Sequence, residues 1–193
     1  MELILASSSR YRRELLERLG MSFIQQAPDV DETPRAGEPA PELVERLAIA
    51  KATAVAEAHP EALIIGSDQV CVLGDSILGK PGTRTNAIRQ LESASGHEVL
   101  FFTGLCVLNG RTGVPQCVVE PFRVHFRTLT RAQIEGYVDK ERPYASAGSF
   151  HSEGLGIALV ERLEGDDPSA LVGLPLIQLV GLLAAEGLDV LLP

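Results

Sequence analysis

Short apolar segments alternate with helix-like segments along this chain, and that alternation restricts its fold more than any other feature. The apolar segments have the length of strands, whereas apolar residues in the segments between them recur at the spacing of one helix face. Such alternation favours an α/β fold in which helices flank a sheet. No repeat, low-complexity tract or linker interrupts the pattern, so we predict one α/β domain over residues 1–193.

The same patterns place the individual elements. We predict strands at Leu3–Ala6, Ser22–Gln26, Leu63–Leu73, Ile77-Leu78, Val99–Leu108, Gln116–Thr128 and Ile157–Leu163. We predict helices at Ser9–Leu19, Pro41–Ala58, Thr85–Ala94, Thr130–Asp139 and Pro175–Ala185. The strongest turn signal is the segment from Asn109 to Gly113, which predicts a hairpin between two long strands.

Charge and cysteine content restrict the partners and the compartment. Seventeen Lys and Arg stand against 26 Asp and Glu, giving a net charge of −9, which argues against binding to a nucleic-acid polymer. The start lacks the basic residues of a signal peptide, and no segment is long and apolar enough for a membrane span. Cys71, Cys106 and Cys117 form no CxxC pair and lie in apolar runs. We therefore expect a cytoplasmic protein with reduced, buried cysteines and no membrane partner.

The junction between the first predicted strand and helix carries an unusual charge pattern. Ser7 precedes a helix whose first turn contains Arg10, Arg12 and Arg13 and no acid before Glu14. Helix N-termini favour acids, so three guanidinium groups there are costly unless an anion lies among them. One interpretation is a phosphate-binding turn, and the other is an exposed basic turn whose arginines pair with surface acids.

Two further charged residues fall in apolar patterns. Lys51 lies on the apolar face of the second predicted helix, where it either extends along apolar surface to solvent or meets a charged ligand. Asp68 interrupts a buried strand pattern, so its carboxylate needs a partner. It is a candidate general base or metal ligand, or it accepts hydrogen bonds from backbone N–H groups.

Other charged residues give weaker signals. Asp29, Asp31 and Glu32 could join Asp68 around a hard divalent cation, although an acidic loop is most often only solvated. Lys80 lies in a Gly-Lys-Pro-Gly turn that lacks the spacing of a phosphate loop. Together, cations and carboxylates of these types suit the hydrolysis of a phosphoanhydride.

Several motifs resemble those of the Maf nucleotide pyrophosphatases, and their order matches over essentially the whole chain. The matching segments are Leu3–Leu16, Asp31–Pro34, Leu47–Ala52, Ile65–Gln69, Gly79–Pro81 and Gly173–Leu176. The resemblance implies a mixed twisted sheet with flanking helices, similar to the Maf and ITPase folds, with two lobes around an active-site cleft. It also implies metal-dependent cleavage of a nucleoside triphosphate to a monophosphate and diphosphate, with Mg²⁺, Mn²⁺ or Co²⁺ as the cation.

The resemblance also implies residue roles. Asp68 would accept the proton, with Glu32 and Asp68 holding the metal and Lys51 completing the catalytic group. Phosphates would be held by Ser7, Arg12, Arg13, Lys51 and Lys80.

The segments Ala147–Gly154 and Gly165–Pro168 resemble the 7-methyl-GTP branch of the family, in which Tyr11, Gln69 and Glu153 would select the base. Methylated guanine carries a positive charge, which suits an aromatic face at Tyr11 and a carboxylate at Glu153. The alternatives are a dTTP/UTP pyrophosphatase and a nucleotide-binding regulator of septum formation. The resemblance further suggests a homodimer. Apart from a second copy of the chain, the only expected partner is the small-molecule nucleotide substrate.

Overall fold

The computed structural model describes residues 1–192, which divide into two compact units. The first unit comprises residues 1–68, 103–120 and the chain from 167 onward, and the second comprises residues 69–102 and 121–166. Neither unit is continuous in sequence, because the chain passes between them inside three strands and again near residue 166. Each unit is described separately below.

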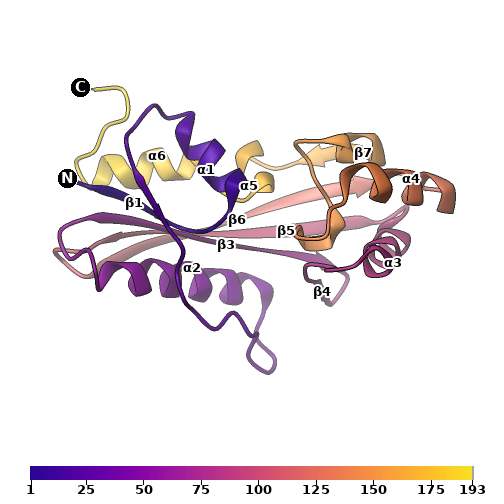
Figure 1. Ribbon diagram of the computed structural model, residues 1–193, viewed down its shortest axis with the longest axis horizontal. Helices are drawn as coiled ribbons and strands as arrows, with labels where there is room; N and C mark the ends of the chain where they lie inside the picture. The colour runs from indigo at the N-terminus through magenta and orange to yellow at the C-terminus, as the bar shows by residue number, and fades with distance from the viewer. Residues whose placement is uncertain (193) are drawn as a thin grey trace. The chain divides into compact units, whose positions relative to one another are not determined.

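The chain forms a seven-stranded sheet with helices, which confirms the predicted α/β class (Figure 1). The strands are β1 (Leu3–Ala6), β2 (Ile24–Gln26), β3 (Leu63–Leu73), β4 (Ser76–Leu78), β5 (Glu98–Asn109), β6 (Val114–Phe126) and β7 (Val160–Glu164). The helices are α1 (Arg10–Glu17), α2 (Ala40–Ala56), α3 (Arg84–Ala94), α4 (Arg131–Glu141), α5 (Pro168–Val172) and α6 (Leu176–Ala185), with 3₁₀ turns η1 (Ala147–Ser149) and η2 (Leu155–Leu159).

The sheet is mixed, as predicted. Its strand order is β2-β1-β3-β5-β6-β7, with β4 attached to β3. Strand β1 runs parallel to both β2 and β3, whereas β4 runs antiparallel to β3 and β7 antiparallel to β6. Parallel neighbours require crossover connections, and α1 and α2 occur in those connections.

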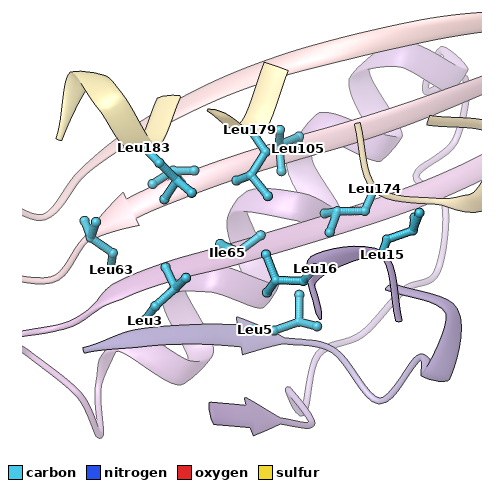
Figure 2. Packing of buried hydrophobic residues seen from close by; sticks show 11 residues of the cluster. Leu3, Leu5, Leu15, Leu16, Leu63, Ile65, Leu105, Leu174, Leu179 and Leu183 are labelled. Atoms are coloured by element: carbon cyan, nitrogen blue, oxygen red, sulfur yellow. The ribbon is translucent and has the colours of Figure 1, made fainter. Parts of the chain in front are cut away.

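The first unit has three layers, because its strands bury both faces. Alternate residues of β1, such as Leu3 and Leu5, pack with α1 and α6 in one hydrophobic cluster (Figure 2). The intervening residues, such as Ile4 and Ala6, pack with α2 in another. Successive strand side chains point to opposite faces, so a continuous apolar run indicates a strand covered by helices on both sides. Helix α2 accordingly lies on the face opposite α1 and α6 (Figure 1).

The second unit contains the end of β3, the start of β5 and the end of β6, and its helices α3 and α4 pack together. Phe150 lies at the centre of an aromatic group, with ring centroids 6.0 Å from Phe101 and 5.4 Å from Phe126. Helix α4 begins with a capping box between Thr130 and Gln133. These contacts organise the unit without any charged residue in its centre.

The structure differs from the sequence prediction near the C-terminus. The strand predicted at Ile157–Leu163 starts only at Val160, because residues 155–159 form a 3₁₀ turn. Gly156 allows that turn, since a Cβ there would lie 2.2 Å from the carbonyl oxygen of His151. Helix α5 was not predicted, because five residues are too short to show a helical period.

Within residues 1–192, no helix combines the length and apolar character needed to cross a membrane. Cys71, Cys106 and Cys117 are free thiols. Cys71 and Cys106 are buried, as expected, whereas Cys117 is only partly buried.

Candidate functional site

The turn between β1 and α1 is held by side chains of serine and glutamine. Ser9 caps α1 by accepting a hydrogen bond from the Arg12 backbone N–H, and the buried Ser7 hydroxyl accepts one from the Ser9 N–H. Gln25 of β2 donates from Nε2 to the carbonyl oxygens of both Ser7 and Ser9, at 2.9 and 3.2 Å. The turn is therefore fixed by the sheet before any ligand arrives.

A buried ion cluster lies in the same unit. Nζ of Lys51 is 2.6 Å from Oδ1 of Asp68 and 2.6 Å from Oε1 of Glu32. The side chains of Lys51 and Asp68 are only 7% and 10% exposed, whereas that of Glu32 is 48% exposed. Lys51 therefore does not extend to solvent along an apolar surface, and the Asp68 carboxylate has a side-chain cation as partner.

A close approach between α2 and β3 makes this cluster geometrically feasible. A Cβ at Gly66 would lie 2.1 Å from the carbonyl oxygen of Ala48 and 2.9 Å from the amide nitrogen of Ala52. Only glycine lets the helix backbone come this near the strand. Lys51, one residue before Ala52, thereby meets Asp68, two residues after Gly66.

Arg12 contributes a second cation near the cluster. Burial lowers the pKa of its guanidinium, and the negative charges of Asp68 and Glu32 oppose that lowering. Its Nε donates a hydrogen bond to the carbonyl oxygen of Gly173, at 2.8 Å. Two cationic and two anionic side chains thus interact at one place, and a highly charged anion or a metal–anion complex can bind there without meeting a net charge of its own sign.

The other arginines of the first turn lie at the surface. Arg13 Nε donates to Glu17 Oε1 at 2.9 Å, with both side chains at least half exposed. Arg10 pairs with Glu14 at 3.4 Å, and its guanidinium lies 4.9 Å from the ring centre of Tyr11. Arg10 and Arg13 therefore fit the interpretation of an exposed basic turn, whereas the Arg12 guanidinium is close enough to Asp68 and Glu32 for their charges to affect its pKa.

The remaining site residues predicted from sequence belong to the second unit. Gln69 follows Asp68 directly in β3 and is partly buried. Lys80 is exposed and lines a hollow with Arg89 and the end of β4. Glu153 is exposed in the loop before η2, where its carboxylate accepts a hydrogen bond from the Ser152 hydroxyl.

The residues that could hold a divalent cation are few. No group of three or more His, Cys, Asp and Glu side chains suited to a metal occurs within residues 1–192. Asp68 and Glu32 nevertheless share one cation, Lys51, and so present carboxylate oxygens toward the same point. Mg²⁺ is commonly bound by one or two carboxylates together with waters and substrate phosphates. The donor set therefore fits a cation that arrives with a phosphate ligand.

Sequence reasoning missed three polar residues that shape the site. Gln25 braces the serine turn, and the fully buried Ser67 donates to the Gly173 carbonyl oxygen at 2.9 Å. Asp167, 2% exposed, caps α5 and also accepts a hydrogen bond from the Ile177 N–H. A serine after the apolar start of a buried strand and an aspartate just before a proline were the signals that could have indicated the last two.

Comparison with known proteins gives near-complete matches. Proteins named 7-methyl-GTP pyrophosphatase from Alcanivorax borkumensis and Nitrosococcus oceani are 59% and 58% identical, covering 97% and 98% of this chain and 95% of each relative. One of the same name from Vibrio vulnificus is 54% identical over 98% of this chain and 97% of its own length.

A solved structure, that of the Staphylococcus aureus Ham1 protein, is matched with a TM-score of 0.49 and 16% identity, over 81% of this chain and 90% of the other. A family model described as Maf-like protein matches residues 2–186. The chain therefore belongs to the Maf family.

Proposed function

We propose that the protein hydrolyses 7-methyl-GTP to 7-methyl-GMP and diphosphate. The observation that carries this proposal is the buried cluster of Lys51, Asp68 and Glu32 with Arg12 beside it. A carboxylate able to accept a proton and two cations able to bind phosphate are the groups that such a hydrolysis needs. The names of the three relatives supply the substrate and the reaction class.

Asp68 is proposed to accept the proton of the attacking water. Its carboxylate is buried and held by Lys51 at 2.6 Å, so its position is fixed before substrate binds. A base held within hydrogen-bond reach of the water can take the proton as the new P–O bond forms. Lys51 keeps the carboxylate oriented and offsets negative charge that develops on the phosphate.

Arg12, Arg13, Ser7 and Lys80 are proposed to bind phosphate oxygens, with Lys51. Arg12 is the best-supported member, because it faces the ion cluster. The Ser7 turn offers backbone N–H groups next to the start of α1, where the helix dipole favours an anion. Arg13 would have to leave Glu17, which costs little because exposed ion pairs are weak. The proposed role of Lys80 in phosphate binding is supported only by the Gly-Lys-Pro motif.

A divalent cation, Mg²⁺, Mn²⁺ or Co²⁺, is proposed to be held by Asp68 and Glu32. When bound, it would neutralise phosphate charge and lower the pKa of a water. Glu32 is half exposed and can turn toward such a cation without leaving an interior position. Lys51 contacts both carboxylates, so its positive charge offsets part of their negative charge.

Tyr11, Gln69 and Glu153 are proposed to select the base. The Tyr11 ring already attracts one cation, the Arg10 guanidinium, and the same cation–π attraction would act on a methylated guanine. The Glu153 carboxylate can accept hydrogen bonds from guanine N1–H and the exocyclic amine, which pyrimidines lack. We expect Glu153→Gln to reduce the preference for 7-methyl-GTP over GTP, and an unchanged kcat/KM ratio would contradict this role.

The test is diphosphate release from a nucleotide panel with each of the three cations. Fastest turnover of 7-methyl-GTP is the expected result. Preferred turnover of dTTP or UTP would assign the pyrimidine branch instead, and binding without turnover would favour a nucleotide-binding regulator.

A cytoplasmic location is also proposed from the cysteine usage and the lack of signal-peptide features, and a homodimer from the family resemblance. Cell fractionation tests the first, and light scattering of the purified full-length protein tests the second.

A further inference from the structure

The carbonyl oxygen of Gly173 accepts two side-chain hydrogen bonds. Arg12 Nε donates to it at 2.8 Å and the Ser67 hydroxyl donates at 2.9 Å. These donors come from α1 and β3, and Ser67 directly precedes Asp68. One backbone atom thus connects the arginine that faces the ion cluster with the strand that carries the proposed base.

The backbone around Gly173 is built to hold that carbonyl in place. Gly173 has φ of 117°, in the left-handed region that favours glycine, and its N–H donates to the carbonyl oxygens of Ser169 and Ala170. A Cβ there would lie 3.3 Å from Arg12 Nε. A side chain at this position would therefore strain the turn and crowd the guanidinium.

A buried acid fixes the turn from the other side. Asp167 accepts hydrogen bonds from the N–H and hydroxyl of Ser169 with one oxygen and from the Ile177 N–H with the other. The Ser169 hydroxyl also accepts a bond from the Leu176 N–H. These bonds join the start of α5 to the start of α6, so the Gly173 turn between the two helices is closed at both ends.

This arrangement sets the direction of the Arg12 guanidinium. The one hydrogen bond recorded for the Arg12 side chain in the described chain uses Nε. No buried side-chain nitrogen or oxygen within residues 1–192 lacks a partner, so each terminal nitrogen of Arg12 is either bonded or reached by solvent. A guanidinium held through Nε has a set direction for its two terminal nitrogens, which suits two-point contact with a phosphate.

We propose that Ser67 and the Gly173 carbonyl form a positioning device for Arg12, which sets its guanidinium for substrate phosphate. Ser67 is a positioning residue that acts through Gly173 and Arg12. The proposal rests on the proposed function, because it assumes that Arg12 binds substrate. Losing the hydroxyl removes one of the two side-chain bonds that set the orientation of the carbonyl group within its turn. A tilt of the carbonyl moves the guanidinium, and a displaced guanidinium weakens phosphate binding.

The first test is a double-mutant cycle with 7-methyl-GTP on Ser67→Ala, Arg12→Gln and the doubly substituted protein. Ser67→Ala is expected to lower kcat/KM about tenfold, mainly by raising KM, because misplaced binding groups cost roughly that much or more. In the Arg12→Gln background the same change is expected to alter kcat/KM less than about twofold, since coupled residues are not additive. Equal factors in both backgrounds would overturn the proposal.

Thr103→Val is the matched control. The Thr103 hydroxyl is fully buried and donates to the Ala170 carbonyl oxygen at 2.9 Å, so its loss removes a similar bond to α5 that Arg12 does not share. The Thr103 substitution is expected to act equally with or without Arg12. If it couples to Arg12 as strongly as Ser67 does, the effect belongs to α5 in general and the proposal is wrong.

A second test needs no activity. Hydrogen exchange of the Arg12 Nε–H, followed by ¹⁵N NMR on the full chain, is expected to be slow in the native protein and at least several-fold faster in Ser67→Ala. An unchanged exchange rate would overturn the proposal. If no nucleoside triphosphate is hydrolysed, the proposed function fails, and this measurement still decides whether Ser67 positions Arg12.

Discussion

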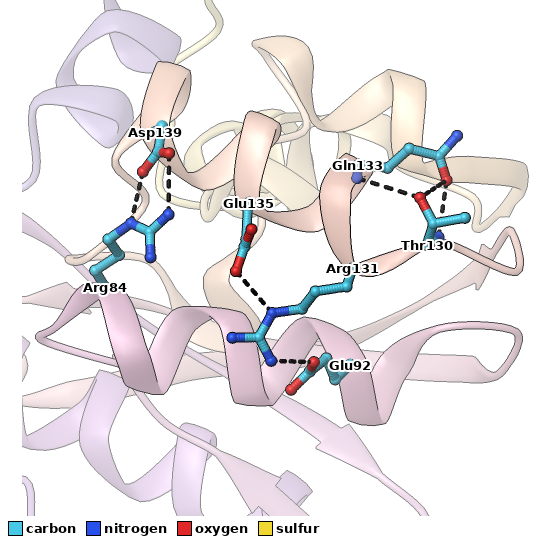
Figure 3. A network of polar contacts seen from close by, with 7 residues as sticks. All are labelled: Arg84, Glu92, Thr130, Arg131, Gln133, Glu135 and Asp139. Atoms are coloured by element: carbon cyan, nitrogen blue, oxygen red, sulfur yellow. Dashed lines mark hydrogen bonds and ion pairs between the residues drawn. The ribbon is translucent and has the colours of Figure 1, made fainter.

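Each of the two units has an ion cluster of its own, and the clusters differ in nearly every physical respect. In the first unit, Lys51 is buried between Asp68 and Glu32. In the second, Arg84 pairs with Asp139 while Arg131 joins Glu92 to Glu135, and all of these side chains are between about a third and two thirds exposed (Figure 3). The exposed cluster links α3 to α4, whereas the buried one links a helix, a strand and a loop.

The difference in burial supports the proposal that the chemistry belongs to the first cluster. Exposed pairs are screened by water and salt and contribute little to stability. Burying ions costs several kcal/mol that hydrophobic residues of similar size would avoid, so a buried cluster is poor evidence for stability. Stability alone therefore does not explain the first cluster, which agrees with its proposed role in the reaction, whereas the second gives modest help in holding two helices together.

The largest effect on stability is expected from Lys51→Met. Removing the cation leaves Asp68 buried without its partner and next to the negative charge of Glu32. Breaking such a pair should lower the free energy of unfolding by about 3 kcal/mol, measured by urea denaturation. Adding Asp68→Asn to the variant should recover part of that loss. If the two losses simply added, the ions would not be coupled as described.

A smaller and mainly kinetic effect is expected from Glu32→Gln. Glu32 is half exposed, so its neutral replacement should change stability little. Loss of a proposed metal ligand should raise the concentration of Mg²⁺ needed for half-maximal activity by about tenfold or more. A metal titration of diphosphate release measures this, and an unchanged midpoint would remove Glu32 from the metal site.

An effect of intermediate size is expected for the ion pair of Glu38 and Arg46, which lies beside the loop that carries Glu32. The Arg46 hydrogen bond lowers the pKa of Glu38 from 4.5 to about 2, with help from the Arg35 backbone N–H. Because the pKa is lower in the folded state, the stabilisation is present above pH 4.5 and is lost as pH falls toward about 2. In Glu38→Gln the free energy of unfolding should therefore fall less steeply as the pH is lowered from 4.5 to about 2. Denaturation measured at each pH tests this. An equally steep fall in the variant and the native protein would show that this pair does not cause the loss of stability in acid.

The smallest effect is expected in the exposed cluster. Arg131→Gln removes the cation that Glu92 of α3 and Glu135 of α4 share, and it should lower the melting temperature by about 2 °C or less at low salt. The shift should vanish near 1 M salt. A shift that persists in high salt would show that the exposed cluster does more than screened surface pairs can do.

The sequence predicted the sheet and most helices because their apolar patterns are long. Strand β3 and helix α2 were recognisable from buried residues over many positions, and both carry site residues. Helix α5 and the η2 turn were missed because they depend on single caps and glycines rather than a period.

The charged residues of the site were predictable by type but not by partner. Lys51 and Asp68 attracted attention as charges in apolar patterns, yet their separation of 17 residues does not show that they meet. The meeting depends on the close approach at Gly66, which is a property of packing. Arg12 and Arg13 look alike in sequence, and only the position of Gly173 separates them.

The most direct test compares one substitution in both clusters. Asp68→Asn and Asp139→Asn each replace a paired carboxylate with an amide of the same shape, one in the buried cluster and one in the exposed cluster. Diphosphate release from 7-methyl-GTP should fall by about a thousandfold in kcat for Asp68→Asn, which is the contribution expected of a general base. Asp139→Asn should stay within about twofold of the native protein. Full activity in Asp68→Asn, or an equal loss in both variants, would contradict the assignment of the chemistry to the buried cluster.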